Sequence, residues 1–211
     1  MFRGLVILIV FITLLFQSAT ADIINIGIYH KSKITSFTFH PVEGSYSVFT
    51  EHGKLLKLDN SELLELTFKN NSISIKSTDK YYGTFKKVRF IGKSWKNSFK
   101  IKPNNSKRIK VYEDNLFVAT HNYYNYFQLI NNIEINNYVT GVVESEVGRS
   151  PPLEYFKLQS IICRTYALKN IKRHQAEGFS LCDKVHCQAY NSKPKSTLIK
   201  NTLYNAIAKH L

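Results

Sequence analysis

The spacing of apolar residues changes once along the chain, near Asn131, and this change limits the possible folds most strongly. Between Asp22 and about residue 118, short segments of β-branched and aromatic residues alternate with turn signals such as Asn70-Asn71. After Asn131 the apolar residues recur at helical spacing. The pattern predicts an α+β fold in which a β-rich part, residues 22–130, precedes a helical part, residues 131–211.

The β-rich part is expected to consist of short strands separated by turns. The expected strands are Ile23–Tyr29, Ser36–Phe39, Tyr46–Thr50, Leu64–Phe68, Ser72–Ile75, Val88–Ile91 and Tyr126–Ile130. Tyr and Phe are abundant, with 13 and 14 residues in the chain. We expect these rings to fill a core between sheets, and an aromatic surface that stacks on sugars is the alternative.

The first 21 residues have the pattern of a secretory signal peptide. Arg3 gives a positive start, the apolar run Leu5–Phe16 follows, and Ala19 and Ala21 fit a cleavage site before Asp22. The run is shorter than the about 20 apolar residues of a membrane span, although an uncleaved anchor is the alternative. We therefore expect an exported protein of the periplasm or cell envelope, with no stable membrane span after cleavage.

The chain is strongly basic, with 29 Lys and Arg against 15 Asp and Glu and a formal net charge of +14. Such an excess favours anionic surroundings, which include nucleic acid, anionic lipid and acidic wall polymers. No nucleic-acid-binding motif is present, and an exported protein seldom meets nucleic acid. We expect general attraction to an anionic envelope and no nucleic-acid partner. Compositional drift towards Lys, Asn and Ile is the alternative.

A glutamate follows an apolar stripe at the start of the helical part. The stripe has the spacing i, i+3, i+4, i+7, i+8 and consists of Ile135, Tyr138, Val139, Val142 and Val143. The next position of the series is Glu146, where partial burial would raise the carboxyl pKa and suit a general acid. Glu144 points off the stripe and is expected to be solvated. Alternatively, the helix frays by residue 144 and both glutamates lie on the surface.

A second helix is predicted after Gly148 and extends to about His174. Ser150 can cap it, Pro151 fits its first position and Glu154 lies in its positive first turn. Its apolar positions cover more than half of the circumference, so we expect it to be central to the domain. They form a stripe of Leu158, Ile161, Ile162, Thr165 and Leu168, with Phe156, Cys163 and Ala167 on a neighbouring face.

Two cysteines and a histidine lie close together after this helix. Cys182, His186 and Cys187 can surround a tetrahedral metal, with His174 as a fourth ligand. A disulfide between Cys182 and Cys187 is equally compatible with an oxidising compartment. The sequence leaves both possibilities open. Cys163, on the predicted second helix, is expected to be a small core residue.

Several of these segments resemble the stage II sporulation protein D family of peptidoglycan lytic transglycosylases. The matching stretches are YVTGVVESE at 138–146, LQSIICRTYAL at 158–168, GFSLCD at 178–183 and HCQAY at 186–190. Their order and spacing follow the family pattern over about residues 131–208. The β-rich part is consistent with the family but contributes no motif.

The resemblance implies cleavage of the bond between N-acetylmuramic acid and N-acetylglucosamine, with a 1,6-anhydro product. It implies that Glu146 is the catalytic acid and that Cys182, His186, Cys187 and, less directly, His174 bind a structural zinc ion. Arg164, Gln188 and Tyr190 are candidates for contact with the sugar. Alternatively, Arg164 is a surface cation or pairs with Glu146, and the other two are packing residues.

The family also includes amidase enhancers, which act through a partner hydrolase and not by catalysis of their own. The resemblance therefore leaves a second function open, a non-enzymatic module that binds the cell wall. The expected partners are peptidoglycan glycan strands and, for an enhancer, another cell-wall hydrolase.

The chain departs from the family pattern in two places. Val147 and Gly148 follow the glutamate where the family commonly has Met-Pro. The family domain usually continues with further strands, whereas this sequence ends at Leu211, soon after Tyr204–Ile207. We therefore expect the family domain to be incomplete at its C-terminus.

Overall fold

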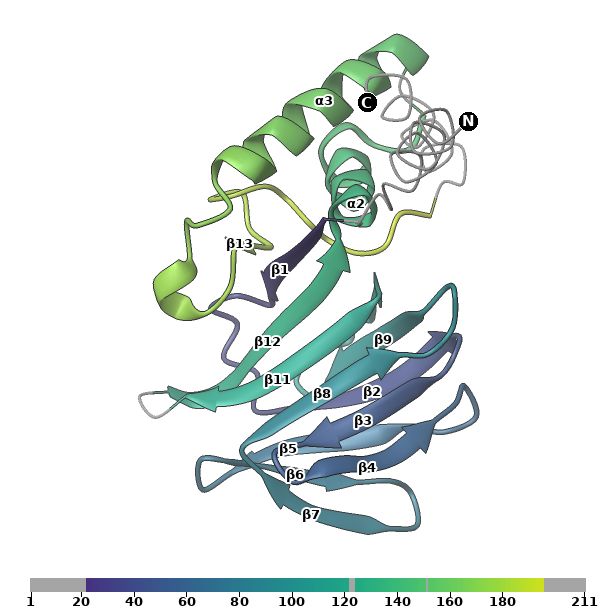
Figure 1. The fold of residues 1–211 in the computed structure, drawn as a ribbon, viewed down its shortest axis with the longest axis vertical. Helices are drawn as coiled ribbons and strands as arrows, with labels where there is room; N and C mark the ends of the chain where they lie inside the picture. The colour runs from purple at the N-terminus through teal and green to yellow at the C-terminus, as the bar shows by residue number, and fades with distance from the viewer. Residues whose placement is uncertain (1–21, 122–123, 151, 196–211) are drawn as a thin grey trace, which may run out of the picture.

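The computed structural model describes residues 22–121, 124–150 and 152–195. The expected signal peptide, residues 1–21, and the stretch 204–207 lie outside this range. Strands of the N-terminal part form two sheets, and the helices follow them at one end of the molecule (Figure 1). The α+β prediction therefore holds broadly, with a β-rich part that precedes the helices. In the described residues, no helix has the length and apolar character that a membrane crossing requires.

The first sheet of the described residues has seven strands in the order β13-β1-β12-β11-β8-β3-β4. These strands are β1 (Ile23–Ile28), β3 (Tyr46–Thr50), β4 (Gly53–Leu58), β8 (Lys87–Gly92), β11 (Asn115–His121), β12 (Tyr124–Glu134) and β13 (Leu181–Cys182). Neighbours are antiparallel except for β13, which pairs with β1 in parallel.

The second sheet has six antiparallel strands within the described residues, in the order β10-β9-β2-β5-β6-β7. These strands are β2 (Ser36–Glu43), β5 (Leu64–Lys69), β6 (Ser72–Lys76), β7 (Tyr81–Phe85), β9 (Ser98–Pro103) and β10 (Lys110–Glu113). All the strands expected from the sequence form. Others, such as β9 (SFKIKP), were not predicted, although Phe99 and Ile101 alternate with lysines as in a half-buried strand.

The core between the two sheets is rich in aromatic rings. Phe39 of β2 stacks on Phe90 of β8 across the sheets, with ring centroids 3.9 Å apart. Phe99 of β9 also stacks on Phe39. Tyr46 of β3 contacts both Phe39 and Phe99 in edge-to-face geometry. These four rings are fully buried, so the prediction that aromatic residues fill the core is confirmed for them.

The first helix, α2 (Ile135–Val147), continues directly from β12. Every residue of the predicted apolar stripe is buried, from Ile135 to Val143. At the junction, the Asp114 carboxylate accepts hydrogen bonds from the Glu134 backbone N–H at 2.9 Å and from Asn137 at 3.2 Å. The strand and the helix are thus fixed to each other at the end of the sandwich.

The second helix, α3 (Leu153–Lys169), differs from its prediction in extent and in orientation. It begins after Pro152, without a side-chain cap, and ends before His174. Its buried residues are Phe156, Ser160, Cys163 and Ala167, whereas Leu158, Ile161 and Ile162 are 55%, 51% and 51% exposed. The helix therefore lies at the edge of the described structure with its larger apolar face outward, and the prediction that it is central was wrong.

Candidate metal centre and the neighbouring glutamate

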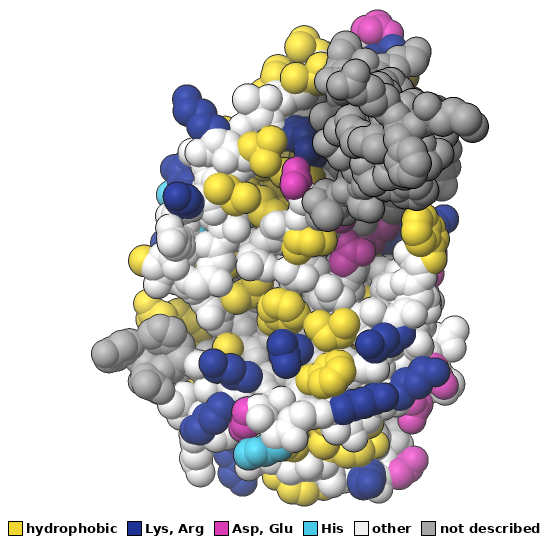
Figure 2. All heavy atoms as spheres, viewed as in Figure 1, with side chains coloured by type: hydrophobic (Ala, Val, Ile, Leu, Met, Phe, Trp, Pro, Cys, Tyr) yellow, Lys and Arg dark blue, Asp and Glu magenta, His cyan; other side chains and the backbone are white. Residues whose placement is uncertain are grey.

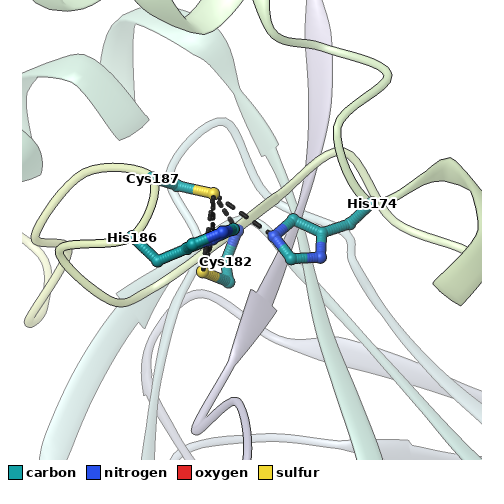
Figure 3. Close-up of side chains that lie close together, drawn as sticks. All are labelled: His174, Cys182, His186 and Cys187. Carbon is teal, nitrogen blue, oxygen red and sulfur yellow. Dashed lines mark hydrogen bonds between the residues drawn. The ribbon is translucent and has the colours of Figure 1, made fainter.

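Four side chains converge in the segment between α3 and residue 187. The donor atoms of His174, Cys182, His186 and Cys187 all lie within 4.8 Å of one another (Figure 3). The two sulfurs are 3.5 Å apart, and the cysteines are free thiols. Cys187 Sγ lies 3.3 Å from His174 Nε2, and His186 Nδ1 lies 3.8 Å from Cys182 Sγ and 3.6 Å from Cys187 Sγ.

These separations fit a tetrahedral zinc ion. Zinc–sulfur bonds of about 2.3 Å and zinc–nitrogen bonds of about 2.0–2.1 Å place the ligand atoms about 3.4–3.8 Å apart. The four distances from a sulfur to the other sulfur or to a ring nitrogen lie within 0.1 Å of that range. The soft thiolate and imidazole donors also match the chemistry that zinc prefers. The residues present can therefore hold the metal that the sequence motif suggested.

The sheet edge positions the metal-ligand candidates. Cys182 ends β13, which pairs with β1 through Gly27. The next residue, Asp183, is buried, and its carboxylate accepts hydrogen bonds from the backbone N–H groups of Tyr29 at 2.8 Å and His30 at 3.2 Å. A turn closed by the Cys187 N–H and the Lys184 carbonyl then brings Cys187 back to Cys182. The pairing of β13 with β1 and this turn thus bring the two cysteines together.

The electrostatic surroundings favour neutral side chains in the metal-free cluster. Burial raises the pKa of the Cys187 thiol to about 11. The positive charge of Arg173 lowers the pKa of His186, and burial adds to this effect. Arg173 is held nearby by its hydrogen bond to the Tyr166 hydroxyl, at 2.7 Å. A metal ion must therefore displace the Cys187 proton, while the His186 imidazole offers its lone pair without loss of a proton at neutral pH.

Two further residues beside this cluster, Glu177 and His30, were not among the residues predicted from the sequence. Glu177 Oε1 lies 2.6 Å from His174 Nδ1, and Glu177 Oε2 lies 3.0 Å from His30 Nε2. Partial burial acts to raise the pKa of Glu177, but the hydrogen bonds of His174 and His30 outweigh it and lower the pKa below its ordinary value. Glu177 could have been predicted, because it lies three residues after the candidate ligand His174. His30 could not, because only the pairing of β1 with β13 brings it near the cluster.

Glu146 lies at the end of α2 and is exposed, so the predicted partial burial is not found. Its Oε2 accepts hydrogen bonds from Gln159 Nε2 at 3.2 Å and from Cys163 Sγ at 3.7 Å, both on α3. The core-facing stripe ends at Val143. In the last turn of α2, Glu146 contacts α3 and not the core. Glu146 is therefore accessible and bonded to two side chains of α3.

Glu144 was expected to be solvated, and this prediction was wrong. Its side chain is only 12% exposed and forms an ion pair with Arg149 Nε at 3.4 Å. It also accepts a hydrogen bond from the Lys195 N–H at 2.9 Å, because the chain returns over the end of α2. Glu144 thus anchors this returning segment, and the two carboxylates have different surroundings.

Gln188 and Tyr190 pack inside the molecule. The Tyr190 ring is fully buried, and its hydroxyl donates to Asn131 Oδ1 at 3.2 Å. The Gln188 amide links the Tyr138 hydroxyl, at 3.3 Å, to the Cys163 carbonyl, at 3.2 Å. Of the two alternatives left by the sequence, the packing role matches this geometry, and neither side chain presents a surface to a sugar.

A close contact explains one glycine of the α2 motif. A Cβ at Gly141 would lie 2.6 Å from the Tyr190 ring and 2.8 Å from the Ser192 carbonyl. Glycine therefore allows the segment after the metal cluster to approach the α2 backbone. The cluster, Tyr190 and α2 are in this way packed as one unit.

Arg164 does not pair with Glu146. Its guanidinium donates to Asn136 Oδ1 at 2.7 Å and lies 3.3 Å from Asp22 Oδ2. It therefore ties α3 to the start of α2 and to the start of the described chain. Its side chain is 22% exposed, so a ligand could contact only a small part of it.

The family model described as Stage II sporulation protein matches residues 123–209. This segment belongs to the stage II sporulation protein D family. The segment contains β12, α2, α3 and the metal cluster, so the resemblance found in the motifs is confirmed for it. No curated protein and no solved structure matched the chain.

The stage II sporulation protein D segment thus begins in the sheet and contains both Glu146 and the Cys/His cluster. Membership supports a function connected with sporulation or the cell wall. The N-terminal strands lie before the match and form most of the two sheets.

Proposed function

We propose that the protein is a peptidoglycan lytic transglycosylase in which Glu146 is the catalytic acid and base. The observation that carries this proposal is the position of the Glu146 carboxylate, which is accessible and held between α2 and α3 by Gln159 and Cys163. The family membership of residues 123–209 supports the same substrate class. An accessible, oriented carboxylate can reach a glycosidic bond of a strand that lies against α2 and α3.

One carboxylate is sufficient for this reaction. Glycosidases that use water need two carboxylates that flank the bond. Here Glu146 gives its proton to the leaving glycosidic oxygen as the bond to muramic C1 breaks. The muramic C6 hydroxyl then attacks C1, and its proton passes to the Glu146 carboxylate. The product is a 1,6-anhydro sugar, and the glutamate regains its proton for the next cycle.

A structural zinc ion held by His174, Cys182, His186 and Cys187 is part of the proposal. Four protein ligands leave no open coordination position, so the ion would supply rigidity and not an activated water. The segment it would fix continues into Gln188 and Tyr190, which pack on Tyr138 and Asn131. Gln188 and Tyr190 would then hold α2 and α3 in place, and with them the Glu146 carboxylate.

Glycan strands free of peptide provide the direct test. We expect the purified protein to release products that end in 1,6-anhydro-N-acetylmuramic acid, identified by mass spectrometry. Glu146→Gln should remove this activity by at least about 100-fold, because the amide cannot exchange the proton. Glu144→Gln is the matched control, and activity lost equally in both variants would assign the effect to folding. Anhydro products from Glu146→Gln would overturn the catalytic role.

The exposure of Glu146 favours a second candidate, a non-enzymatic module that binds glycan strands and stimulates another cell-wall hydrolase. A carboxylate that stays in contact with water is a weaker acid catalyst than one held in a closed cleft. In this case the protein should co-sediment with glycan strands without cleaving them. Added amidase should then release more peptide in its presence. Both candidates require export to the cell envelope, which follows from the signal peptide expected at residues 1–21.

A further inference from the structure

The His174 imidazole is held from both sides. Its Nε2 lies 3.3 Å from Cys187 Sγ, on the side of the metal-ligand cluster. Its Nδ1 lies 2.6 Å from Glu177 Oε1, on the opposite side. The second oxygen of the same carboxylate is 3.0 Å from His30 Nε2. Glu177 therefore joins a metal-ligand candidate to His30, in the turn after β1.

The chemistry of these contacts selects one tautomer of His174. An ionised carboxylate only accepts hydrogen bonds, so the ring nitrogen next to it must carry a proton. Nδ1 is then the donor, and Nε2 has the free lone pair. That nitrogen lies beside Cys187 Sγ, where a metal ion would need its lone pair.

The surroundings of the ring also restrict its rotation. His174 is 6% exposed. Phe179 stacks on the ring with centroids 4.9 Å apart and an interplanar angle of 21°. His30 contacts it edge-on at 5.2 Å. A flip of the ring by half a turn would keep the stacking but would break the hydrogen bond to Glu177 and the contact with Cys187 Sγ.

We propose that Glu177, supported by His30, is a positioning residue that fixes the tautomer and orientation of His174 for metal binding. The inference rests on the zinc site proposed above. Carboxylates that accept the second N–H of a ligating imidazole orient the ring and increase its basicity, and their removal typically weakens metal binding by about 10- to 100-fold. His30 holds the far oxygen and so limits the movement of the carboxylate.

A second metal ion bound by His30, His174 and Glu177 is the competing interpretation. Their donor atoms do lie within 4.8 Å of one another. However, two ligands of one zinc ion are normally about 3.3 Å apart or more, given bonds of about 2.0–2.1 Å. The distance of 2.6 Å between Glu177 and His174 is that of a hydrogen bond. The geometry thus favours a shared proton, and we expect one zinc ion per chain.

Zinc titration of the metal-free protein tests the proposal. A chromophoric chelator that competes for the ion gives both affinity and stoichiometry. We expect Glu177→Ala to lower zinc affinity about 10- to 100-fold. Glu177→Gln keeps an acceptor oxygen and should recover part of the loss. Glu154→Ala, which removes an exposed glutamate paired with Lys157 on α3, is the matched control and should bind as the wild type does.

Nitrogen NMR of the His174 ring separates positioning from a merely structural role. In the metal-free wild type the proton should reside on Nδ1, and Glu177→Ala should give a mixture of tautomers without a change in the unfolding temperature. Glu177 is about half exposed, so the variants are expected to fold.

The outcomes distinguish the two proposals. A wild-type protein that binds no zinc overturns the zinc site and the positioning role together. Wild-type binding that Glu177→Ala leaves unchanged overturns the positioning role alone. Two zinc ions per chain would replace the shared proton with a second metal site.

Discussion

The Cys187 thiol links the fold to the solution conditions under which the cluster can bind a metal. Its sulfur is buried beside Cys182 and also accepts a hydrogen bond from the Cys182 N–H at 3.4 Å. Burial raises its pKa to about 11, so the thiol keeps its proton at neutral pH. A metal ion binds the thiolate and must displace this proton.

The resulting prediction concerns pH. Because the free protein carries the Cys187 proton and the metal complex does not, zinc affinity should fall as the pH falls. The decrease should be at least about tenfold per pH unit between about pH 8 and pH 6, from this thiol alone. Chelator competition at several pH values measures it. An affinity independent of pH in this window would mean that Cys187 is not a ligand.

At the scale of elements, the orientation of α3 decides which apolar residues stabilise the fold. Phe156 is 3% exposed and Ile161 is 51% exposed, although both belong to the apolar part of the helix. Hydrophobic side chains are visible on the outer surface near α3 (Figure 2). The helix contacts α2 through its narrower face, which contains Ser160, Cys163 and Ala167.

This orientation predicts unequal effects of truncation. Phe156→Ala should lower the free energy of unfolding by about 3–5 kcal/mol, because it leaves a cavity in the core. Ile161→Ala should change it by less than about 1 kcal/mol, since a half-exposed side chain loses little burial. Urea denaturation of both variants measures the difference. Equal costs would show that the outer face of α3 is covered in solution.

Much of this arrangement could be predicted from the sequence. The α2 stripe is apolar on one side only, so its period also gives its buried face. On α3 the apolar residues cover more than half of the circumference, so the period could not tell the inner from the outer face. Glu146 continues the spacing of the α2 stripe, but the helix has by then left the core. The spacing of apolar residues along a helix does not show where the core that the helix packs against ends.

The proximity of the Cys/His cluster could be predicted from the sequence, but the residues that support the cluster could not. The short spacing of Cys182, His186 and Cys187 fixes their proximity within one loop. His30 and Asp183 meet only because β13 pairs in parallel with β1, and the Asp183 contact to Tyr29 spans 154 residues. Such a pairing leaves no local signal in a single sequence.

At the scale of the whole molecule, the positive charge is spread widely. Lys and Arg side chains are distributed over the visible face of the sandwich and do not form one patch (Figure 2). With a net charge of +14, the protein has a general attraction to anionic polymers. This distribution fits contact with an extended charged surface better than with a single small ligand.

The prediction at this scale is strong salt dependence. Binding to purified anionic cell-wall material should weaken as the Debye length falls from about 10 Å at 0.1 M salt to about 3 Å at 1 M. Co-sedimentation at the two salt concentrations measures the bound fraction. Binding that persists unchanged at high salt would indicate specific contacts and not diffuse charge.

The parallel contact between β13 and β1 also orders events in time. The first strand of the described chain leaves the ribosome long before Leu181 and Cys182 are synthesised, yet it is their partner in the sheet. Until then the edge of β1 is open, and the cysteines have no scaffold on which to meet. The loop that carries the cysteines therefore gains its support only after Leu181 and Cys182 have paired with β1. A formed cluster therefore requires that the segments around Gly27 and Cys182 have paired.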